Sequence, residues 1–234
     1  MPLLRCQIWD ICIIIWHLID GGIALCQSKY IGTLLQCFGL EECKPIATPM
    51  ETGLHLSLHD VGDAFDAILY QQAVGCLIYL CITQPDIHFA VSEMSRFMHC
   101  LGVNHWQAVK HIFRYLSGTR LLGLFYPKGG SLPPNLHAFS DSDWAGCYDT
   151  HVSTSGFCLM IGSSCISRLS KKQPIVATSS CEAEYRAAFT TTVECVGLRR
   201  LLADLGVGQS SATTIFTDHH SAMALCVPCS HHVH

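Results

Sequence analysis

Acidic residues at three distant points of the sequence have the types and spacing to bind a metal ion. Asp141 and Asp143 end the run LHAFSDSD, Glu184 lies in SSCEAEYRAA, and Asp218 follows ATTIFT. Carboxylate oxygens are the ligands that suit Mg²⁺ and Mn²⁺. Carboxylates held close together repel one another, so an apolar surrounding favours protonation of one of them or the binding of a cation. For Asp141 and Asp143, a simpler alternative is that the pair caps a turn.

Four short segments with alternating polar and apolar residues predict the strands that would carry the aspartates. They are LHAFSDSD, TSGFCLMIG, SCISRLS and ATTIFTD. In the first of them, alternation places Phe139, Asp141 and Asp143 on one face. Asp218 comes at the carboxyl end of the last strand, and the ligands of open α/β sheets gather beyond such ends. If these two strands are parallel neighbours, Asp141 and Asp218 lie side by side.

A long amphipathic helix is predicted between the third and fourth strands, over SSCEAEYRAAFTTTVECVGLRRLLADLG and ending at Gly206. It can serve as the right-handed crossover between parallel strands of an α/β domain. Ser179 and Glu182 match a capping box, and Glu182 also lies one turn before Arg186. Ordinary contacts therefore explain the Glu182 carboxylate.

Glu184 has no such local explanation. It shares a helical stripe with Ala188, Thr191, Cys195, Leu198 and Leu202, and this is the face that should meet the sheet. Burying an unpaired charge costs several kcal/mol, so a carboxylate near the start of this face needs a partner. A metal ion shared with Asp141 and Asp218 would provide one.

The composition allows a sizeable core. Half of the 234 residues are hydrophobic, 14% are charged, and the mean hydropathy is +0.32. The apolar cluster over 11–26 is interrupted by Asp20 and is shorter than the roughly 20 residues that a membrane span needs, so we expect a buried strand or core segment and no membrane partner. A signal peptide is the weaker alternative, because Arg5 precedes the run. Fifteen scattered cysteines fit a reducing intracellular compartment, the cytoplasm or the nucleus. The net charge of −4 argues against a free-standing nucleic-acid binder that relies on phosphate neutralisation.

The chain falls into four predicted segments. Turn formers over 41–63 indicate a linker, and apolar residues at helical spacing over 64–117 indicate three helices. On the third of these, Lys110 and Arg114 lie one turn apart, as a solvated face or as a phosphate contact. The segments are an N-terminal remnant with its linker (1–63), a mostly helical region (64–133), an α/β domain (134–225) and a divergent tail (226–234).

The tail CVPCSHHVH offers a competing metal chemistry. Cys226 and Cys229 have the CxxC spacing of zinc ligands, and His231, His232 and His234 follow them. A structural zinc site needs a closed tetrahedral set of ligands on a scaffold. The alternative is a terminus whose cysteines and histidines are accidental.

Several motifs resemble one known family. SDSDWAG, STSGF, SKKQPIVATSSCEAEYRAA and FTDHHSA match, in order and spacing, the ribonuclease H domain of copia-type retrotransposon polyproteins. Upstream, YQQAVGCLIYLCITQPDIHFAVSEMSRFM, NHWQAVKHIFRYLSGT and LLGLFYP resemble the segment that joins reverse transcriptase to ribonuclease H, and LCQSKYIGTLLQCFGLEECKPIATPM resembles the reverse transcriptase tail. The resemblance implies a ribonuclease H-like mixed sheet with a crossover helix, preceded by a mostly helical connection region.

The same resemblance implies a reaction. The catalytic, metal-binding acids would be Asp141, Glu184 and Asp218, with Asp143 as a neighbour of the site. Two Mg²⁺ (or Mn²⁺) ions roughly 4 Å apart would support endonucleolytic hydrolysis of the RNA strand of an RNA–DNA hybrid. The hybrid would be read through its 2′-OH groups and its shape. The upstream reverse transcriptase portion of the parent polyprotein would be a partner, and candidate nucleic-acid contacts are Lys110, Arg114, Lys171 and Lys172.

The sequence also departs from the family pattern. After SAMALC it continues as VPCSHHVH, so the family's next strand, last helix and final site residue are expected to be missing. Gly197 stands mid-helix where the family has tryptophan, which should cost about 1 kcal/mol in helix propensity and leave a cavity. We therefore expect hydrolysis that is impaired by truncation. The alternatives are a non-catalytic retroelement remnant with weak nucleic-acid binding, and a zinc-tail interaction module.

Overall fold

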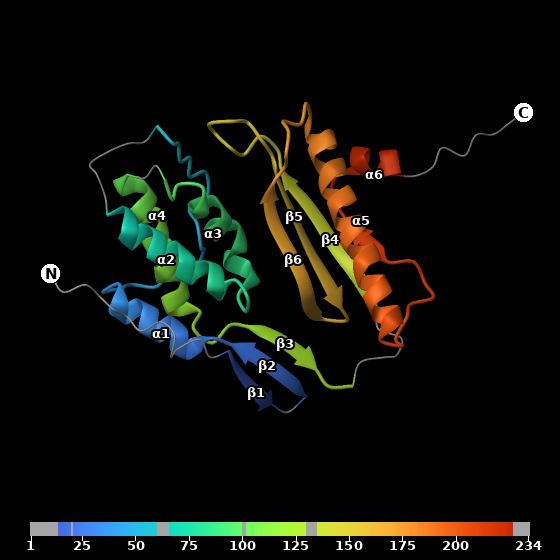
Figure 1. The fold of residues 1–234 in the computed structure, drawn as a ribbon, viewed down its shortest axis with the longest axis horizontal. Coiled ribbons are helices and arrows are strands. Elements are labelled where there is room, and N and C mark those ends of the chain that lie inside the picture. The colour runs from blue at the N-terminus through green and yellow to red at the C-terminus, as the bar shows by residue number, and fades with distance from the viewer. Residues whose placement is uncertain (1–13, 20, 60–65, 100–101, 130–134, 227–234) are drawn as a thin grey trace, which may run out of the picture. The chain divides into compact units, whose positions relative to one another are not determined.

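The structure, a computed structural model, describes residues 14–19, 21–59, 66–99, 102–129 and 135–226 (Figure 1). The chain divides after Lys128 into two compact units, each with both helices and strands. Within the described stretches, none of the helices combines the length and the hydrophobicity that a membrane crossing requires.

The described part of the first unit contains four α-helices and one short 3-10 turn around a shared apolar core. The Asp66 carboxylate caps one helix by accepting hydrogen bonds from the backbone N–H groups of Ile68 and Leu69, at 2.9 and 3.1 Å. The largest fully buried side chains include Tyr70, Phe97 and Phe113. The three helices predicted over 64–117 are confirmed. The helical elements are α1 (Ser28–Cys37), α2 (Ala67–Leu80), η2 (Pro85–Ile87), α3 (His88–Ser95) and α4 (Val103–Gly118).

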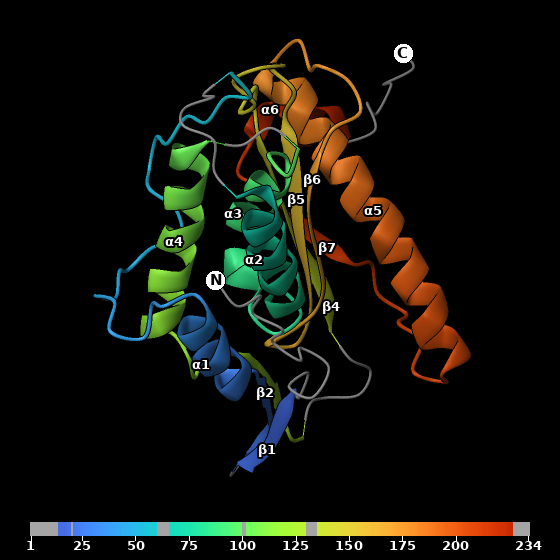
Figure 2. The same cartoon turned by 60° about the vertical axis from the view of Figure 1, so that its left-hand side comes forward.

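A small antiparallel sheet completes this unit, in the order β1-β2-β3; Figure 1 labels all three strands, and Figure 2 shows β1 and β2 from another side. Its strands are β1 (Ile15–Ile19), β2 (Gly22–Cys26) and β3 (Leu124–Pro127). The strand predicted within 11–26 is confirmed, but the expectation that it is buried is wrong for the edge strand, because Leu18 is 75% exposed. β1 is an edge strand, paired in this sheet with β2 alone, and the side chains of Leu18 and Ile19 are exposed.

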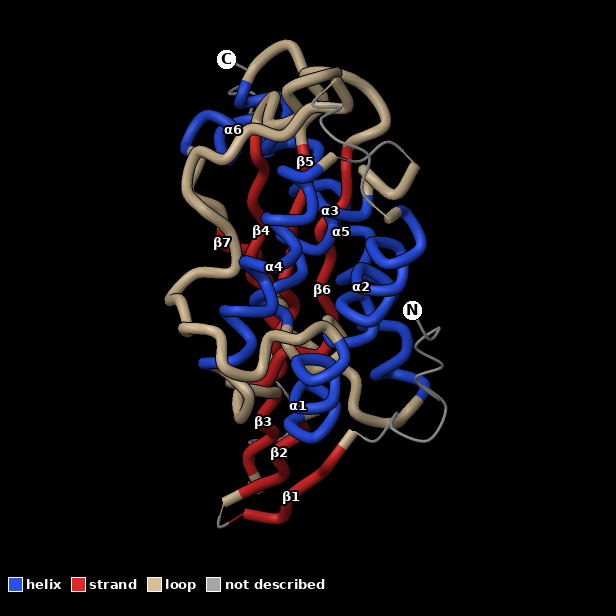
Figure 3. Tube along the Cα trace, turned by 90° about the vertical axis from the view of Figure 1, so that its left-hand side faces the viewer, coloured by secondary structure: helices blue, strands red, loops and turns tan. Residues whose placement is uncertain are grey.

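The second unit is an α/β structure with a mixed sheet in the order β6-β5-β4-β7 (Figure 3). Its strands are β4 (Leu136–Asp143), β5 (Thr154–Ile161), β6 (Ser164–Lys172) and β7 (Thr214–Phe216). β4, β5 and β6 form an antiparallel meander, whereas β7 pairs in parallel with β4. All four predicted strands are therefore confirmed, and the first and last of them are parallel neighbours.

One long helix, α5 (Ser180–Asp204), connects β6 to β7 and packs against the sheet, as predicted for the crossover. A short helix, α6 (His220–Cys226), follows β7. Small residues on α5 allow this close packing, because Ala183, Ala187 and Thr191 are fully buried. Thr191 also donates a hydrogen bond of 3.1 Å from its hydroxyl to Ser140 Oγ on β4. The apolar part of the interface is formed by Ala138, Leu159 and Cys195, with Phe157, Ile166, Leu198 and Ile215 packed around them.

Gly197 lies in the middle of α5 on its exposed side, and no other atom would come within 4 Å of a Cβ built there. The expected cavity is therefore wrong, since a side chain at this position would extend into solvent. We predict that Gly197→Ala raises the free energy of unfolding by about 1 kcal/mol through helix propensity, measured by urea titration. Gly75→Ala, at an equally open helical position of α2, should give a similar gain.

Gly162→Ala is the matched control for this prediction. Gly162 also has nothing within 4 Å of a built Cβ, but its φ of +59° lies in the left-handed region. Alanine there should lower the free energy of unfolding by about 1 kcal/mol. An unchanged or lowered stability of Gly197→Ala would contradict the propensity argument.

Candidate metal centre

The three acids singled out by their spacing lie on elements that converge at one end of the second sheet. The parallel pairing of β4 with β7 places Phe139 opposite Phe216. Asp141 and Asp218 each lie two residues beyond these partners, at the carboxyl ends of the paired segments. Glu184 reaches them from the second turn of α5, which packs against β4.

The carboxylates of Asp141, Glu184 and Asp218 each offer an oxygen, and these oxygens all lie within 4.8 Å of one another. Among the described residues, no other group of three or more histidine, cysteine, aspartate or glutamate side chains is placed to share an ion. Glu184 is buried, whereas Asp141 and Asp218 are exposed. The acidic cluster, formed by these three residues, is thus anchored in the protein on the helix side and open to solvent on the strand side. Because oxygen-only donor sets suit Mg²⁺ and Mn²⁺, the cluster could bind such a cation.

Glu184 is held in place by one neighbour, Ser142. Its Oε1 accepts a hydrogen bond from the Ser142 backbone N–H at 3.0 Å and another from the Ser142 hydroxyl at 2.9 Å. Its Oε2 is buried and has no hydrogen-bond partner among the described residues. A buried carboxylate oxygen without a donor is costly, and a bound cation would satisfy it. The cluster therefore fits a divalent cation on the evidence of its own geometry.

The electrostatic surroundings of Glu184 also favour a bound cation. Burial raises the pKa of its carboxyl group above the ordinary value of 4.5, and the negative charges of Asp141 and Asp218 raise this pKa further. The two hydrogen bonds from Ser142 oppose these effects, since they favour the carboxylate form. Without a cation, the site thus resists the accumulation of a third negative charge.

Asp143 takes a different place from Asp141. It lies outside the acidic cluster, and its carboxylate lies so close to Gly146 that no Cβ would fit there. Burial raises the pKa of Asp143, and the charge of Asp141 adds to this shift. The alternative of a turn residue is therefore favoured for Asp143, while Asp141 belongs to the cluster.

Glu182 shows the ordinary contacts that the sequence predicts. Ser179 Oγ accepts a 3.2 Å hydrogen bond from the Glu182 backbone N–H, and Arg186 Nη2 donates to Glu182 Oε1 at 2.7 Å. Thr178 is the residue before the helix N-cap, and its backbone N–H donates a hydrogen bond of 2.8 Å to Glu182 Oε2. The hydrogen bond from the Thr178 hydroxyl has the largest effect on the pKa of Glu182, and the hydrogen bond from Arg186 has the next largest. Together they lower this pKa to about 2. This glutamate is a fully engaged capping residue.

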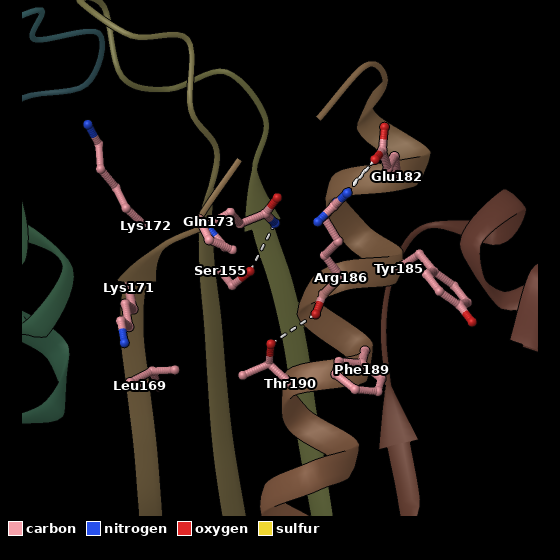
Figure 4. A pocket seen from close by; sticks show the side chains of 11 residues that line it. Ser155, Leu169, Lys171, Lys172, Gln173, Glu182, Tyr185, Arg186, Phe189 and Thr190 are labelled. Atoms are coloured by element: carbon pink, nitrogen blue, oxygen red, sulfur yellow. Dashed lines mark hydrogen bonds and ion pairs between the residues drawn. The ribbon is translucent and has the colours of Figure 1, made fainter. Parts of the chain in front are cut away.

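A cavity of about 760 Å³ lies between β6 and the first turns of α5 (Figure 4). Arg186 lines it and is two residues from Glu184, about 200° around the helix, so the cavity and the acidic cluster lie on different sides of α5. Lys171 and Lys172 extend from β6 on the strand side. Lys172 Nζ contacts Cys147 Sγ at 2.7 Å and Thr150 Oγ1 at 3.2 Å, whereas Lys171 is exposed.

The other two candidate nucleic-acid contacts lie on α4, in the first unit. Arg114 donates from Nε to the backbone carbonyl oxygen of Lys44 at 3.0 Å, so its guanidinium has a structural role in holding the segment that follows α1. Lys110 lies over the ring of Trp106, with Nζ 5.8 Å from the ring centroid. Both contacts favour the interpretation of a structured surface over that of a dedicated phosphate site.

Sequence reasoning missed Ser142, which fixes the orientation of Glu184. Alternation places this residue on the face opposite Asp141 and Asp143, and therefore toward the helix. A small hydroxyl residue on the helix-facing side of that strand was the available signal. The competing zinc ligands cannot be placed: Cys226 ends α6 and is exposed, but Cys229 and the three tail histidines lie outside the described residues.

Several curated proteins similar to this chain are retrovirus-related Pol polyproteins of transposons. The chain is 42% identical over 208 residues to the retrovirus-related Pol polyprotein from transposon RE2 of Arabidopsis thaliana, and 39% identical over 209 residues to that from transposon TNT 1-94 of Nicotiana tabacum. These alignments cover 89% and 86% of the chain but 14% and 15% of the polyproteins, so the chain spans about one seventh of their length. An uncharacterized mitochondrial protein of Arabidopsis thaliana is 40% identical over 174 residues, which are 74% of the chain and 71% of that protein. No family model and no solved structure matches the chain.

Proposed function

We propose that this chain, which belongs to the retrovirus-related Pol polyproteins of copia-type transposons, uses the acidic cluster of its second unit for ribonuclease H chemistry. The reaction is the metal-dependent hydrolysis of the RNA strand of an RNA–DNA hybrid. The observation that carries the proposal is the convergence of the Asp141, Glu184 and Asp218 carboxylates within 4.8 Å on a mixed α/β sheet. The mixed sheet with its crossover helix supports the same assignment, because a ribonuclease H-like fold requires both.

Each residue of the cluster has a distinct part in this chemistry. Ser142 holds Oε1 of Glu184 through two hydrogen bonds, which leaves the buried Oε2 available as a ligand for the cation. Asp141 and Asp218 are exposed and can meet a phosphodiester backbone that approaches from solvent. A bound Mg²⁺ or Mn²⁺ would stabilise negative charge on the scissile phosphate and lower the pKa of a bound water.

The surrounding segments take their proposed roles from the same family. We infer that residues 1–63 derive from the end of a reverse transcriptase and its linker, that 64–133 form the connection region, and that 134–225 carry the ribonuclease H-like domain. The upstream reverse transcriptase portion of a parent polyprotein is the corresponding partner, a role supported by the two similar Pol polyproteins named above, of which the chain covers 14% and 15%.

The direct test is cleavage of a labelled RNA strand annealed to DNA, with Mg²⁺ and with EDTA. We expect cleavage only with the metal and only of RNA in the hybrid, leaving 5′-phosphate and 3′-hydroxyl ends. The DNA–DNA and RNA–RNA duplexes of the same sequence serve as controls, because they present a different pattern of 2′-OH groups. Absence of metal-dependent cleavage, or equal cleavage of all duplexes, would contradict the proposal.

Lys171 provides a test of substrate binding that is separate from catalysis. Its ammonium group is exposed at the end of β6, where a phosphate can reach it. We predict that Lys171→Ala weakens hybrid binding to a similar extent for all base sequences, and lowers the slope of log affinity against log salt by about 1. Binding is measured by fluorescence anisotropy in EDTA, so that the hybrid stays intact.

The control for this measurement is Lys29→Ala, at an exposed lysine of α1 in the first unit. Its salt slope should equal that of the wild type. A Lys171→Ala protein that keeps the wild-type slope would show that Lys171 makes no phosphate contact.

A further inference from the structure

Three sulfur atoms meet on one face of the second sheet, and none of them belongs to the acidic cluster. Cys158 Sγ lies 3.4 Å from Cys165 Sγ and 3.5 Å from Met160 Sδ. Neither cysteine forms a disulfide bond. Cys165 is 9% exposed, and Cys158 and Met160 are half-buried, so this sulfur cluster lies just below the surface.

Strand geometry explains why the three sulfurs converge. Cys158 and Met160 are two residues apart on β5, so alternation places both on the same face. Cys165 lies directly opposite Met160 on β6, and a register shift next to Met160 accompanies this pairing. Cys158 and Cys165 are therefore diagonal neighbours across the two strands.

This arrangement suits two ligands of one ion better than a disulfide. A disulfide requires Cβ atoms about 3.8 Å apart and a sulfur separation of about 2.04 Å, whereas diagonal partners in a sheet are roughly 7 Å apart at their backbones. Two sulfurs that each lie about 2.3 Å from a shared metal are about 4 Å from one another. The observed separations of 3.4 and 3.5 Å approach this value and need only small side-chain shifts.

The donor set selects the ion. Thiolate and thioether sulfurs are soft ligands and favour Cu(I), whereas zinc in structural sites takes four thiolate or imidazole ligands. No third histidine, cysteine, aspartate or glutamate is placed to join Cys158 and Cys165 among the described residues. We propose that Cys158, Met160 and Cys165 form a three-sulfur binding site for a single Cu(I) ion.

The charges around the site are consistent with this ion. Binding displaces one proton from each thiol, so the two thiolates and one Cu⁺ carry a net charge of −1. Arg168 lies opposite Cys158 in the strand register, and its guanidinium can balance this charge. Binding involves no change in oxidation state, provided that copper is supplied as Cu(I) without oxygen.

The experiment is a thiol footprint of the reduced full-length chain under anaerobic conditions. One equivalent of Cu(I), buffered with bathocuproine disulfonate, is added before N-ethylmaleimide, and the modification of each cysteine is followed by mass spectrometry. We expect Cu(I) to slow modification of Cys158 and Cys165 at least tenfold, while the half-buried Cys37 and Cys43 of the first unit react at unchanged rates. Running the same assay with Cys226→Ser/Cys229→Ser protein removes the CxxC pair of the tail as a competitor.

Variants distinguish binding from incidental protection. Met160→Leu keeps the size and apolar character of the side chain, and should weaken Cu(I) binding about tenfold by chelator competition without altering the circular dichroism spectrum. Cys158→Ser should abolish protection of Cys165, whereas Cys181→Ser, at a half-buried cysteine of α5, should preserve it. Unchanged protection in Cys158→Ser, equal affinity of Met160→Leu and wild type, or recovery of a Cys158–Cys165 disulfide in place of bound copper would each overturn the proposal.

Discussion

Replacing Asp141 with asparagine should reduce the rate of Mg²⁺-dependent hybrid cleavage roughly 100- to 1,000-fold. Asparagine keeps the shape of the side chain but removes one negative charge from a cluster whose oxygens lie within 4.8 Å. A metal contribution of several kcal/mol to transition-state stabilisation corresponds to a loss of this size, because each 1.36 kcal/mol changes the rate tenfold. Single-turnover cleavage of the labelled hybrid at saturating enzyme measures the effect on the chemical step.

Asp143→Asn is the matched control for that substitution. The same chemical change is made two residues further along the same strand, at a carboxylate that lies against Gly146 and outside the acidic cluster. We expect its cleavage rate to stay within about tenfold of the wild type. Circular dichroism and thermal melting of both variants establish that the fold is retained. Equal cleavage rates for Asp141→Asn and wild type, or equal losses of rate in the two variants, would show that Asp141 has no specific role in cleavage.

The sequence predicted those parts of the second unit that depend on local periodicity. Alternation placed Asp141 at the end of a strand, and the 3.6-residue period placed Glu184 on the buried side of α5. The parallel neighbour relation of β4 and β7 was only a condition of the sequence argument, because the crossover rule relates the two strands that α5 joins, β6 and β7, and does not specify which strand lies beside β7. With that condition met in the structure, the two local inferences bring the carboxylates to one point.

Features that depend on long-range contacts could not be predicted. The pairing of β3 with β2 joins residues about 100 positions apart, and nothing in the local pattern of either segment specifies its partner. The hydrogen bonds from Ser142 to Glu184 depend on the precise depth of α5 over the sheet. The sulfur cluster depends on a register shift beside Met160, which strand periodicity does not reveal.

Replacing Glu184 with glutamine should remove the stabilisation of the protein by Mg²⁺. Without a cation, burial raises the pKa of Glu184 above 4.5, so the folded state favours the protonated form. The stability that this group contributes is fully present below its unfolded pKa and is lost as the pH rises through the raised folded pKa. Divalent cations require the carboxylate form and therefore act in the opposite direction. At 100 times its dissociation constant, Mg²⁺ should raise the free energy of unfolding of the wild type by about 2.7 kcal/mol.

Urea unfolding between pH 5 and pH 8, with and without Mg²⁺, measures both effects. In the absence of metal, glutamine stays neutral, so Glu184→Gln should gain stability relative to the wild type as the pH rises. Addition of Mg²⁺ should raise the free energy of unfolding of the wild type but leave that of Glu184→Gln unchanged. Sodium chloride at the same ionic strength distinguishes site binding from general screening of surface charge, because Na⁺ screens charge but binds carboxylate clusters weakly.

Glu182→Gln is the control, because the pKa of Glu182 is lowered whereas that of Glu184 is raised. Its hydrogen bonds with Thr178, and next with Arg186, lower the pKa of Glu182 to about 2, so the stability from this group is present above the unfolded pKa and is lost as the pH falls toward 2. Glu182→Gln should therefore be less stable than the wild type across the whole measured range, yet respond fully to Mg²⁺. Because the two glutamates are two residues apart on one helix, a general change in helix charge would affect both variants alike. If Mg²⁺ stabilised Glu184→Gln as strongly as Glu182→Gln, the buried carboxylate would not be a metal ligand.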